Sequence, residues 1–163
     1  MTTTRRLAAV NRLWPLVPMM AKLVPAVPAD DEHWGYEIKW DGIRLLARIE
    51  HGAVQLMTRN LIDATNRYPE LAALANALGG RSVVLDGELV GFDDSGRATF
   101  EALQGRMGLE GGKRVMSRVG VSVAYMIFDL LSLDDESQLG MPYEERRAAL
   151  EALGWKDRTG TRR

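Results

Sequence analysis

A segment of alternating apolar and polar residues, Tyr36 to Asp41, most constrains the fold of this chain. Tyr36, Ile38 and Trp40 occupy every second position, and this period of two predicts a half-buried strand. The polar residues of the segment would then share the opposite face: Glu37, Lys39 and Asp41. A lysine held beside carboxylates is a candidate covalent nucleophile, and a solvated surface charge is the alternative.

Four further strands are predicted from runs of apolar and β-branched residues: 43–50, 53–58, 83–90 and 121–131. The first two are joined by His51-Gly52, a turn signal. Acidic turns are expected at 93–96 and 133–136, and a glycine-rich loop at 109–113.

Three helices are predicted between and after these strands. The first begins near Pro69, carries one apolar stripe and ends at Gly79-Gly80; the stripe consists of Leu71, Leu74, Ala75 and Leu78. A short helix passes through Leu103 and Arg106. The last runs over 142–153, with Gly154 as C-cap. Strand hairpins with interspersed helices indicate an α+β fold of antiparallel sheets packed with helices.

A second polar cluster lies on the predicted strand 83–90. Asp86 and Glu88 project from one face of it. Magnesium prefers one or two carboxylates together with phosphates and water, so one or two such acids would suffice for a metal site. Asp86 is either a second acid of this kind or a structural partner. Arg44 and Arg59 supply the planar cations that phosphate contacts require.

The segments around Lys39, Glu88 and Phe128 resemble, in this order, motifs I, III and IIIa of the covalent nucleotidyltransferases. Further similarities favour the ATP-dependent DNA ligases of bacteria, especially the ligase module of end-joining enzymes: K-W-D-G-I-R at 39–44, T-R-N at 58–60, T-N-R-Y-P-E-L at 65–71 and F-E-A-L-Q-G-R at 100–106. The resemblance covers about 15–153. It implies a partial nucleotidyltransferase (ATP-grasp-like) adenylation domain.

The resemblance also implies a role for each site residue. Lys39 would attack ATP and carry AMP, and Glu37 would contact the adenine edge or orient the strand. Asp41 and Glu88 would serve a magnesium or manganese ion, with turn capping as the alternative for Asp41. The remaining nucleotide contacts would be Arg44, Arg59, Glu88 and Phe128, the last by stacking on adenine. The substrate would be nicked or broken duplex DNA.

Family members continue with a glutamate-glycine motif IV, a lysine-rich motif V and an OB-fold domain, and none of these follows before Arg163. We therefore expect an extended arm at 1–30, a partial adenylation domain at 31–154 and a frayed basic tail at 155–163. A split gene, a frameshifted remnant and a fragmentary gene model all fit. Two rival functions stay open: an RNA ligase or capping guanylyltransferase, and a non-catalytic remnant that binds nucleotide or a complementary ligase fragment.

Composition limits the class of protein, its possible ligands and its cellular compartment. Its 163 residues are 46% hydrophobic, which suits one ordinary core, and the net charge of −1 gives no support for nucleic-acid binding. There are no cysteines, and His33 and His51 lack metal-ligand spacing. Arg5-Arg6 loosely resembles a twin-arginine signal, but prolines and Lys22 interrupt the apolar stretch that follows. We expect a bacterial cytoplasmic, nucleoid-associated protein without a membrane partner.

Overall fold

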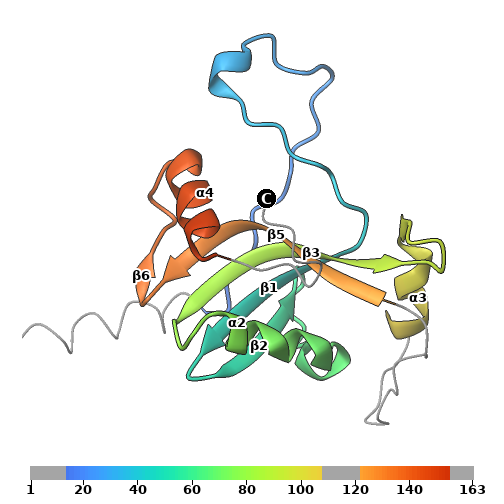
Figure 1. Cartoon of the computed structure of the whole chain (residues 1–163). Helices are drawn as coiled ribbons and strands as arrows, with labels where there is room; N and C mark the ends of the chain where they lie inside the picture. Colours follow the sequence, from blue (N-terminus) through green and yellow to red (C-terminus); the bar gives the residue numbers. More distant parts are fainter. Residues whose placement is uncertain (1–13, 108–121, 155–163) are drawn as a thin grey trace, which may run out of the picture.

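A computed structural model describes residues 14–107 and 122–154 of the chain. Its centre is one curled antiparallel sheet with the strand order β2-β1-β3-β5-β6, and the short β4 pairs with β3 (Figure 1). The strands are β1 (Ile43–Glu50), β2 (Ala53–Thr58), β3 (Val83–Phe92), β4 (Ala98–Thr99), β5 (Ser122–Leu133) and β6 (Glu136–Ser137). The expected α+β class with antiparallel pairing is confirmed.

The helices are short and lie around the sheet. They are the 3₁₀ helices η1 (Asp31–His33), η2 (Thr65–Arg67) and η3 (Pro69–Ala72), and the α-helices α2 (Ala73–Ala77), α3 (Glu101–Met107) and α4 (Tyr143–Ala152). The helix predicted from Pro69 is therefore a 3₁₀ turn followed by a short α-helix, although its predicted stripe does face the core. No helix within 14–107 or 122–154 has the length and apolar character needed to span a membrane.

The turns form where the sequence predicts them. His51 and Gly52 both have positive φ, 50° and 78°, as a two-residue hairpin turn requires. The side chain of Asp93 accepts hydrogen bonds from the backbone amides of Ser95 and Arg97, both 2.9 Å long. Gly154 follows α4 with a φ of 68°, consistent with the predicted C-cap. The predicted loop 109–113 and tail 155–163 lie outside the described residues.

The strand predicted at 36–41 is absent, which corrects the first expectation. This stretch is extended, but it pairs with no strand of the described sheet. Tyr36 and Ile38 leave 61% and 67% of their surface exposed, so the apolar face that alternation suggested is not buried. Alternation indicates an extended backbone, whereas a strand also needs a neighbouring edge to pair with.

Each face of the sheet has its own apolar cluster. The larger one lies between the sheet and the helices and includes Leu45, Leu85, Leu103 and Leu150. The smaller one, on the other side of β1 and β3, joins Leu46, Val84 and Leu131 to the arm residues Trp14 and Leu16. Residues 14–42 then leave the sheet as a projecting loop and return to β1 (Figure 1).

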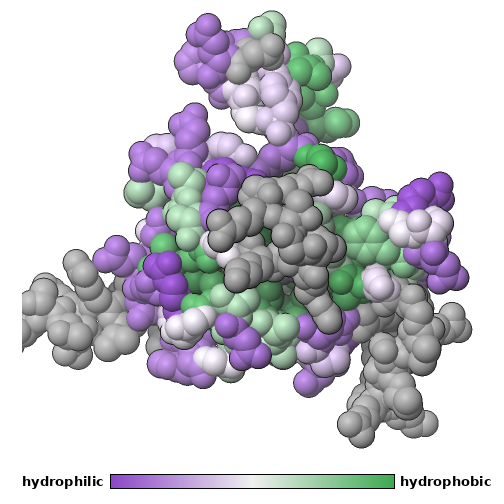
Figure 2. All heavy atoms as spheres, in the orientation of Figure 1, coloured by the Kyte–Doolittle hydropathy of each residue, from purple (hydrophilic) through white to green (hydrophobic). Residues whose placement is uncertain are grey.

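The projecting loop exposes much apolar surface. Several of its side chains are largely exposed, among them Val17, Met19, Leu23 and Val27. Figure 2 shows hydrophobic surface on this loop beside strongly hydrophilic residues. The loop is thus held to the fold mainly by its two ends.

Candidate functional site

Polar residues from β1 and β3 meet on one face of the sheet. Arg44 and Glu88 are register partners in the antiparallel β1–β3 ladder, so their side chains project from the same side. Leu46 and Asp86 form the next pair on that side, which places Asp86 diagonally from Arg44. The alternation of side chains along β1 and β3 thus brings together three of the polar residues singled out from the sequence, Arg44, Asp86 and Glu88.

Arg44 is fixed by a two-pronged ion pair with Asp86. Its Nε donates to Asp86 Oδ1 at 2.6 Å and its Nη2 to Asp86 Oδ2 at 2.7 Å. The same Nη2 also donates to the carbonyl oxygen of Met19 at 3.3 Å. Asp86 is almost fully buried. Burial raises the pKa of Asp86, while the Arg44 guanidinium acts in the opposite direction. In this structure Asp86 is thus the ion-pair partner of Arg44.

Phe128 lies beside this ion pair. The register of β3 with β5 shifts between Asp86 and Gly87, so Phe128 is an extra residue at a β-bulge. The guanidinium carbon of Arg44 sits 4.8 Å from the ring centroid, a cation–π distance. The predicted aromatic residue and the predicted arginine therefore contact each other, with the arginine covering one face of the ring.

Glu88 is the half-buried acid of the site. Burial raises its pKa, and the nearby backbone amide of Gly42 opposes that rise. The positive charges of Arg44 and Lys39 also lower the pKa of Glu88, whereas the carboxylate of Asp41 raises it. These influences place Lys39 and Asp41 within electrostatic reach of Glu88.

Gly42 is required by close approach of the backbone. A Cβ atom at this position would lie 2.1 Å from the carbonyl oxygen of Leu89 and 3.2 Å from Cγ of Glu88. Any side chain would therefore push the chain away from β3 and from Glu88. Lys39 itself is exposed, three residues before this contact.

Two predicted site residues lie apart from this group. Glu37 accepts a hydrogen bond from Tyr143 Oη at 2.7 Å, and Nη1 of Arg147 lies 3.6 Å from the same carboxylate oxygen. Arg59 follows β2 in an exposed turn, and no described residue forms an ion pair with it. Tyr143 and Arg147 of α4 were missed by the sequence reasoning, because no local pattern links positions 106 residues apart.

The described residues contain no group of three or more His, Cys, Asp or Glu that could hold a metal ion. A metal ion served by Glu88 and Asp41 alone would thus have two protein carboxylates. Such a set fits magnesium bound largely by phosphate oxygens and water, and does not fit a metal held by protein ligands alone.

Comparison with known proteins gives the family. A family model described as "ATP dependent DNA ligase domain" matches residues 18–160. The chain belongs to the ATP-dependent DNA ligase family. It is 41% identical over 138 residues to the multifunctional non-homologous end joining DNA repair protein LigD of Mycobacterium tuberculosis, and 43% identical over 138 residues to the LigD protein of Pseudomonas aeruginosa. Each alignment covers 85% of this chain, but only 17% and 15% of those relatives.

Solved structures of this ligase family share the fold. The ligase domain from M. tuberculosis LigD matches with a TM-score of 0.60 and 44% identity, over 72% of this chain and 36% of that one. A mycobacterial DNA ligase D complexed with ATP and MES matches with a TM-score of 0.59 and 42% identity. The predicted partial nucleotidyltransferase fold is thereby confirmed. The chain covers 36% and 35% of these two solved chains.

Proposed function

We propose that this ligase-family chain takes part in nucleotidyl transfer through Lys39. Its Nζ attacks the α-phosphorus of ATP, a nitrogen–phosphorus bond forms, the bond to pyrophosphate breaks, and the amine releases a proton to solvent. The observation that carries the proposal is the position of Lys39. It is exposed to incoming nucleotide, within electrostatic reach of Glu88, and tied to the sheet by the close contact of Gly42.

The surrounding residues have complementary roles in this proposal. Glu88 and Asp41 serve magnesium or manganese, which supplies positive charge at the phosphates. Arg44 and Arg59 contact phosphate or ribose, with Arg44 already oriented by its two hydrogen bonds to Asp86. Glu37 faces the adenine edge.

Phe128 is the proposed stacking partner of adenine. The Arg44 guanidinium covers one face of its ring, so adenine needs the other face or a displacement of Arg44. In either case a bound adenine would lie parallel to the ring, and it would compete with the cation–π contact only on the face that Arg44 covers.

For the whole reaction we propose sealing of nicked or broken duplex DNA in repair and recombination, in the bacterial cytoplasm on nucleoid DNA. Two steps follow AMP loading, and both need DNA held through many phosphate contacts. The formal net charge of −1 leaves no excess of cations for this. We therefore expect sealing only when the remainder of the ligase domain is supplied, for example as a complementary ligase fragment.

The test of Lys39 is transfer of label from α-labelled ATP, followed by denaturing electrophoresis. We expect one AMP per chain in the presence of magnesium, no label in Lys39→Ala, and full label in Lys22→Ala, which removes another exposed lysine. Label that survives in Lys39→Ala would refute the assignment. Absence of label in the unaltered chain would favour the non-catalytic alternative, and labelling by GTP would favour a guanylyltransferase.

Glu88→Gln tests the acid of the site. It keeps the size of the side chain and removes its charge, so AMP transfer should fall by about tenfold to a thousandfold, the range for losing one preorganised electrostatic group. Glu101→Gln is the matched control, because Glu101 is exposed on α3. Equal rate losses in the two variants would exclude the proposed role of Glu88.

A further inference from the structure

The segment that carries Lys39 is attached to the fold on both sides of the lysine. On one side Gly42 lies against β3, close to the Leu89 carbonyl oxygen and the side chain of Glu88. On the other side Gly35 and Glu37 contact Tyr143 of α4. Between these attachments the extended backbone pairs with no strand of the described sheet. The position of Lys39 therefore depends on both contacts.

Tyr143 makes two contacts with this segment. Its hydroxyl donates to Glu37 Oε1 at 2.7 Å. Its ring edge would lie 3.0 Å from a Cβ on Gly35, so the ring packs closely on the backbone there. Partial burial, and then the hydrogen bond to Glu37, raise the pKa of Tyr143, which keeps the hydroxyl protonated as a donor.

Helix α4 presents a second group to the same carboxylate. Arg147 follows Tyr143 by four residues, so both side chains lie on one helix face. Its Nη1 is 3.6 Å from Glu37 Oε1. Both contacts fall on Oε1, and within the described part of the chain Oε2 has no hydrogen-bond partner.

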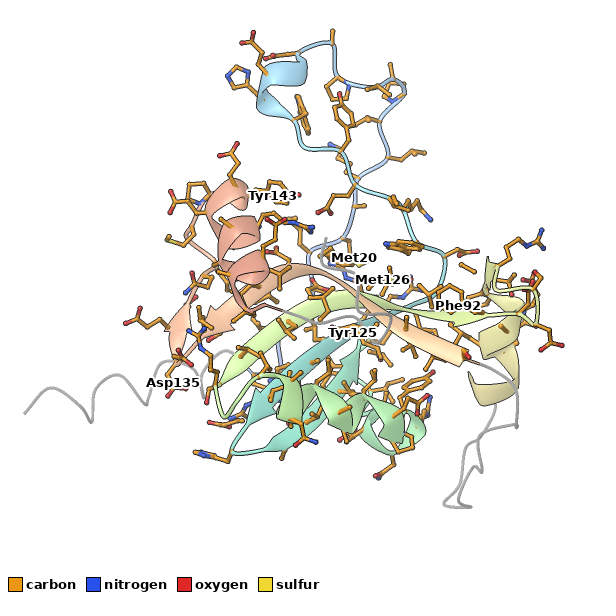
Figure 3. The ribbon with its side chains drawn as sticks, in the orientation of Figure 1. Met20, Phe92, Tyr125, Met126, Asp135 and Tyr143 are labelled. Atoms are coloured by element: carbon orange, nitrogen blue, oxygen red, sulfur yellow. The ribbon has the colours of Figure 1, made fainter. Side chains whose placement is uncertain are left out.

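Helix α4 is itself anchored to the sheet. Arg146 donates to Asp129 of β5 through Nε at 2.8 Å and Nη2 at 2.9 Å. Leu150, one turn further, is buried in the main cluster. Figure 3 shows Tyr143 at the start of α4, at the end of the helix near the projecting loop. A firmly packed helix thus holds the otherwise unpaired segment.

We infer that Tyr143, assisted by Arg147, is a positioning residue for Lys39. It acts through Glu37 and holds the lysine segment beside Glu88, while Glu37 Oε2 stays available to accept a hydrogen bond from the amino group of adenine. The anchor itself follows from the contacts of α4; its catalytic consequence rests on the proposed AMP transfer to Lys39.

Trypsin digestion of the folded chain tests the anchor without any nucleotide. The bond after Lys39 lies in the anchored segment, and the bond after Arg97, which is largely exposed in a turn, is an internal reference. In Tyr143→Phe we expect cleavage after Lys39 to accelerate roughly fivefold relative to cleavage after Arg97, the effect of losing about one net hydrogen bond. Glu144→Gln, a change of an exposed neighbour on α4, should leave the ratio unchanged.

AMP transfer supplies the second measurement. Tyr143→Phe should raise the KM for ATP and slow transfer by a similar factor, because the lysine samples more positions. An unchanged cleavage ratio would overturn the anchor whatever the activity. Faster cleavage with unchanged AMP transfer would overturn the positioning role. If Tyr143→Phe is cleaved faster but the unaltered protein takes up no AMP, the proposed function is refuted and the anchor remains supported.

Discussion

Replacing Arg44 by methionine should destabilise the fold strongly. The change leaves the carboxylate of Asp86 buried, with 6% of its side chain exposed, and without its two hydrogen bonds from Arg44. Breaking a fully buried pair from one side costs about 3–5 kcal/mol. Because the Arg44 side chain is 23% exposed, we place the loss of unfolding free energy near the lower end, at about 3 kcal/mol.

The loss should also depend on pH. Burial already raises the pKa of Asp86 above its usual range, and removing the guanidinium raises this pKa further. The folded state then holds the Asp86 proton to higher pH than the unfolded state does. Stability of Arg44→Met is therefore lost as pH rises through the folded-state pKa, and the variant should be closer to the unaltered protein at about pH 5 than at about pH 8.

Urea unfolding followed by circular dichroism at both pH values measures this effect. The matched control is Arg81→Met. Arg81 also donates to an aspartate through Nε and Nη2, at 3.0 and 2.7 Å from Asp134 Oδ2, but this pair is about half exposed. Exposed pairs contribute about 0–1 kcal/mol. An Arg44→Met loss no larger than the control's, or equal at both pH values, would refute the reasoning.

Two further changes test the packing around the site. Gly42→Ala should lower the unfolding free energy by about 1–3 kcal/mol and reduce AMP transfer, because its Cβ would sit 2.1 Å from the Leu89 carbonyl oxygen. The control is Gly52→Ala, where no atom lies within 4 Å of the Cβ; it should affect stability alone, through its φ of 78°. Urea unfolding and labelling with ATP compare the two variants. Tyr125→Phe removes a hydroxyl that donates to the Leu45 carbonyl oxygen at 2.8 Å, and should lower the unfolding free energy by about 1–2 kcal/mol in thermal or urea unfolding. An unchanged midpoint would contradict this.

Local signals predicted the turns and the strands of the sheet that flank them, but not the absence of a strand at 36–41. The two strands of the hairpin at His51-Gly52 have the predicted bounds. The signals for this hairpin are two turn residues with positive φ and the apolar runs on either side, and all of them lie within sixteen residues of sequence. Contacts across the sheet were not predictable in this way. The Tyr125 ring, for example, packs where a Cβ on Gly87 would sit, 2.6 Å away, and reaches the carbonyl of Leu45 on a third strand. No spacing in the sequence encodes that contact.

The candidate site shows the same division between local pattern and tertiary contact. Residues on one strand face, such as Asp86 and Glu88, could be grouped from alternation alone, and their meeting with Arg44 follows once β1 pairs with β3. The Lys39 segment could not be placed by alternation, because that pattern requires a neighbouring strand and the described sheet offers it none. Its position instead comes from a close backbone contact at Gly42 and from Tyr143 on a helix more than a hundred residues away. The proposed nucleophile Lys39 thus lies outside any described strand ladder and depends on these two contacts, whereas Glu88 is held within β3.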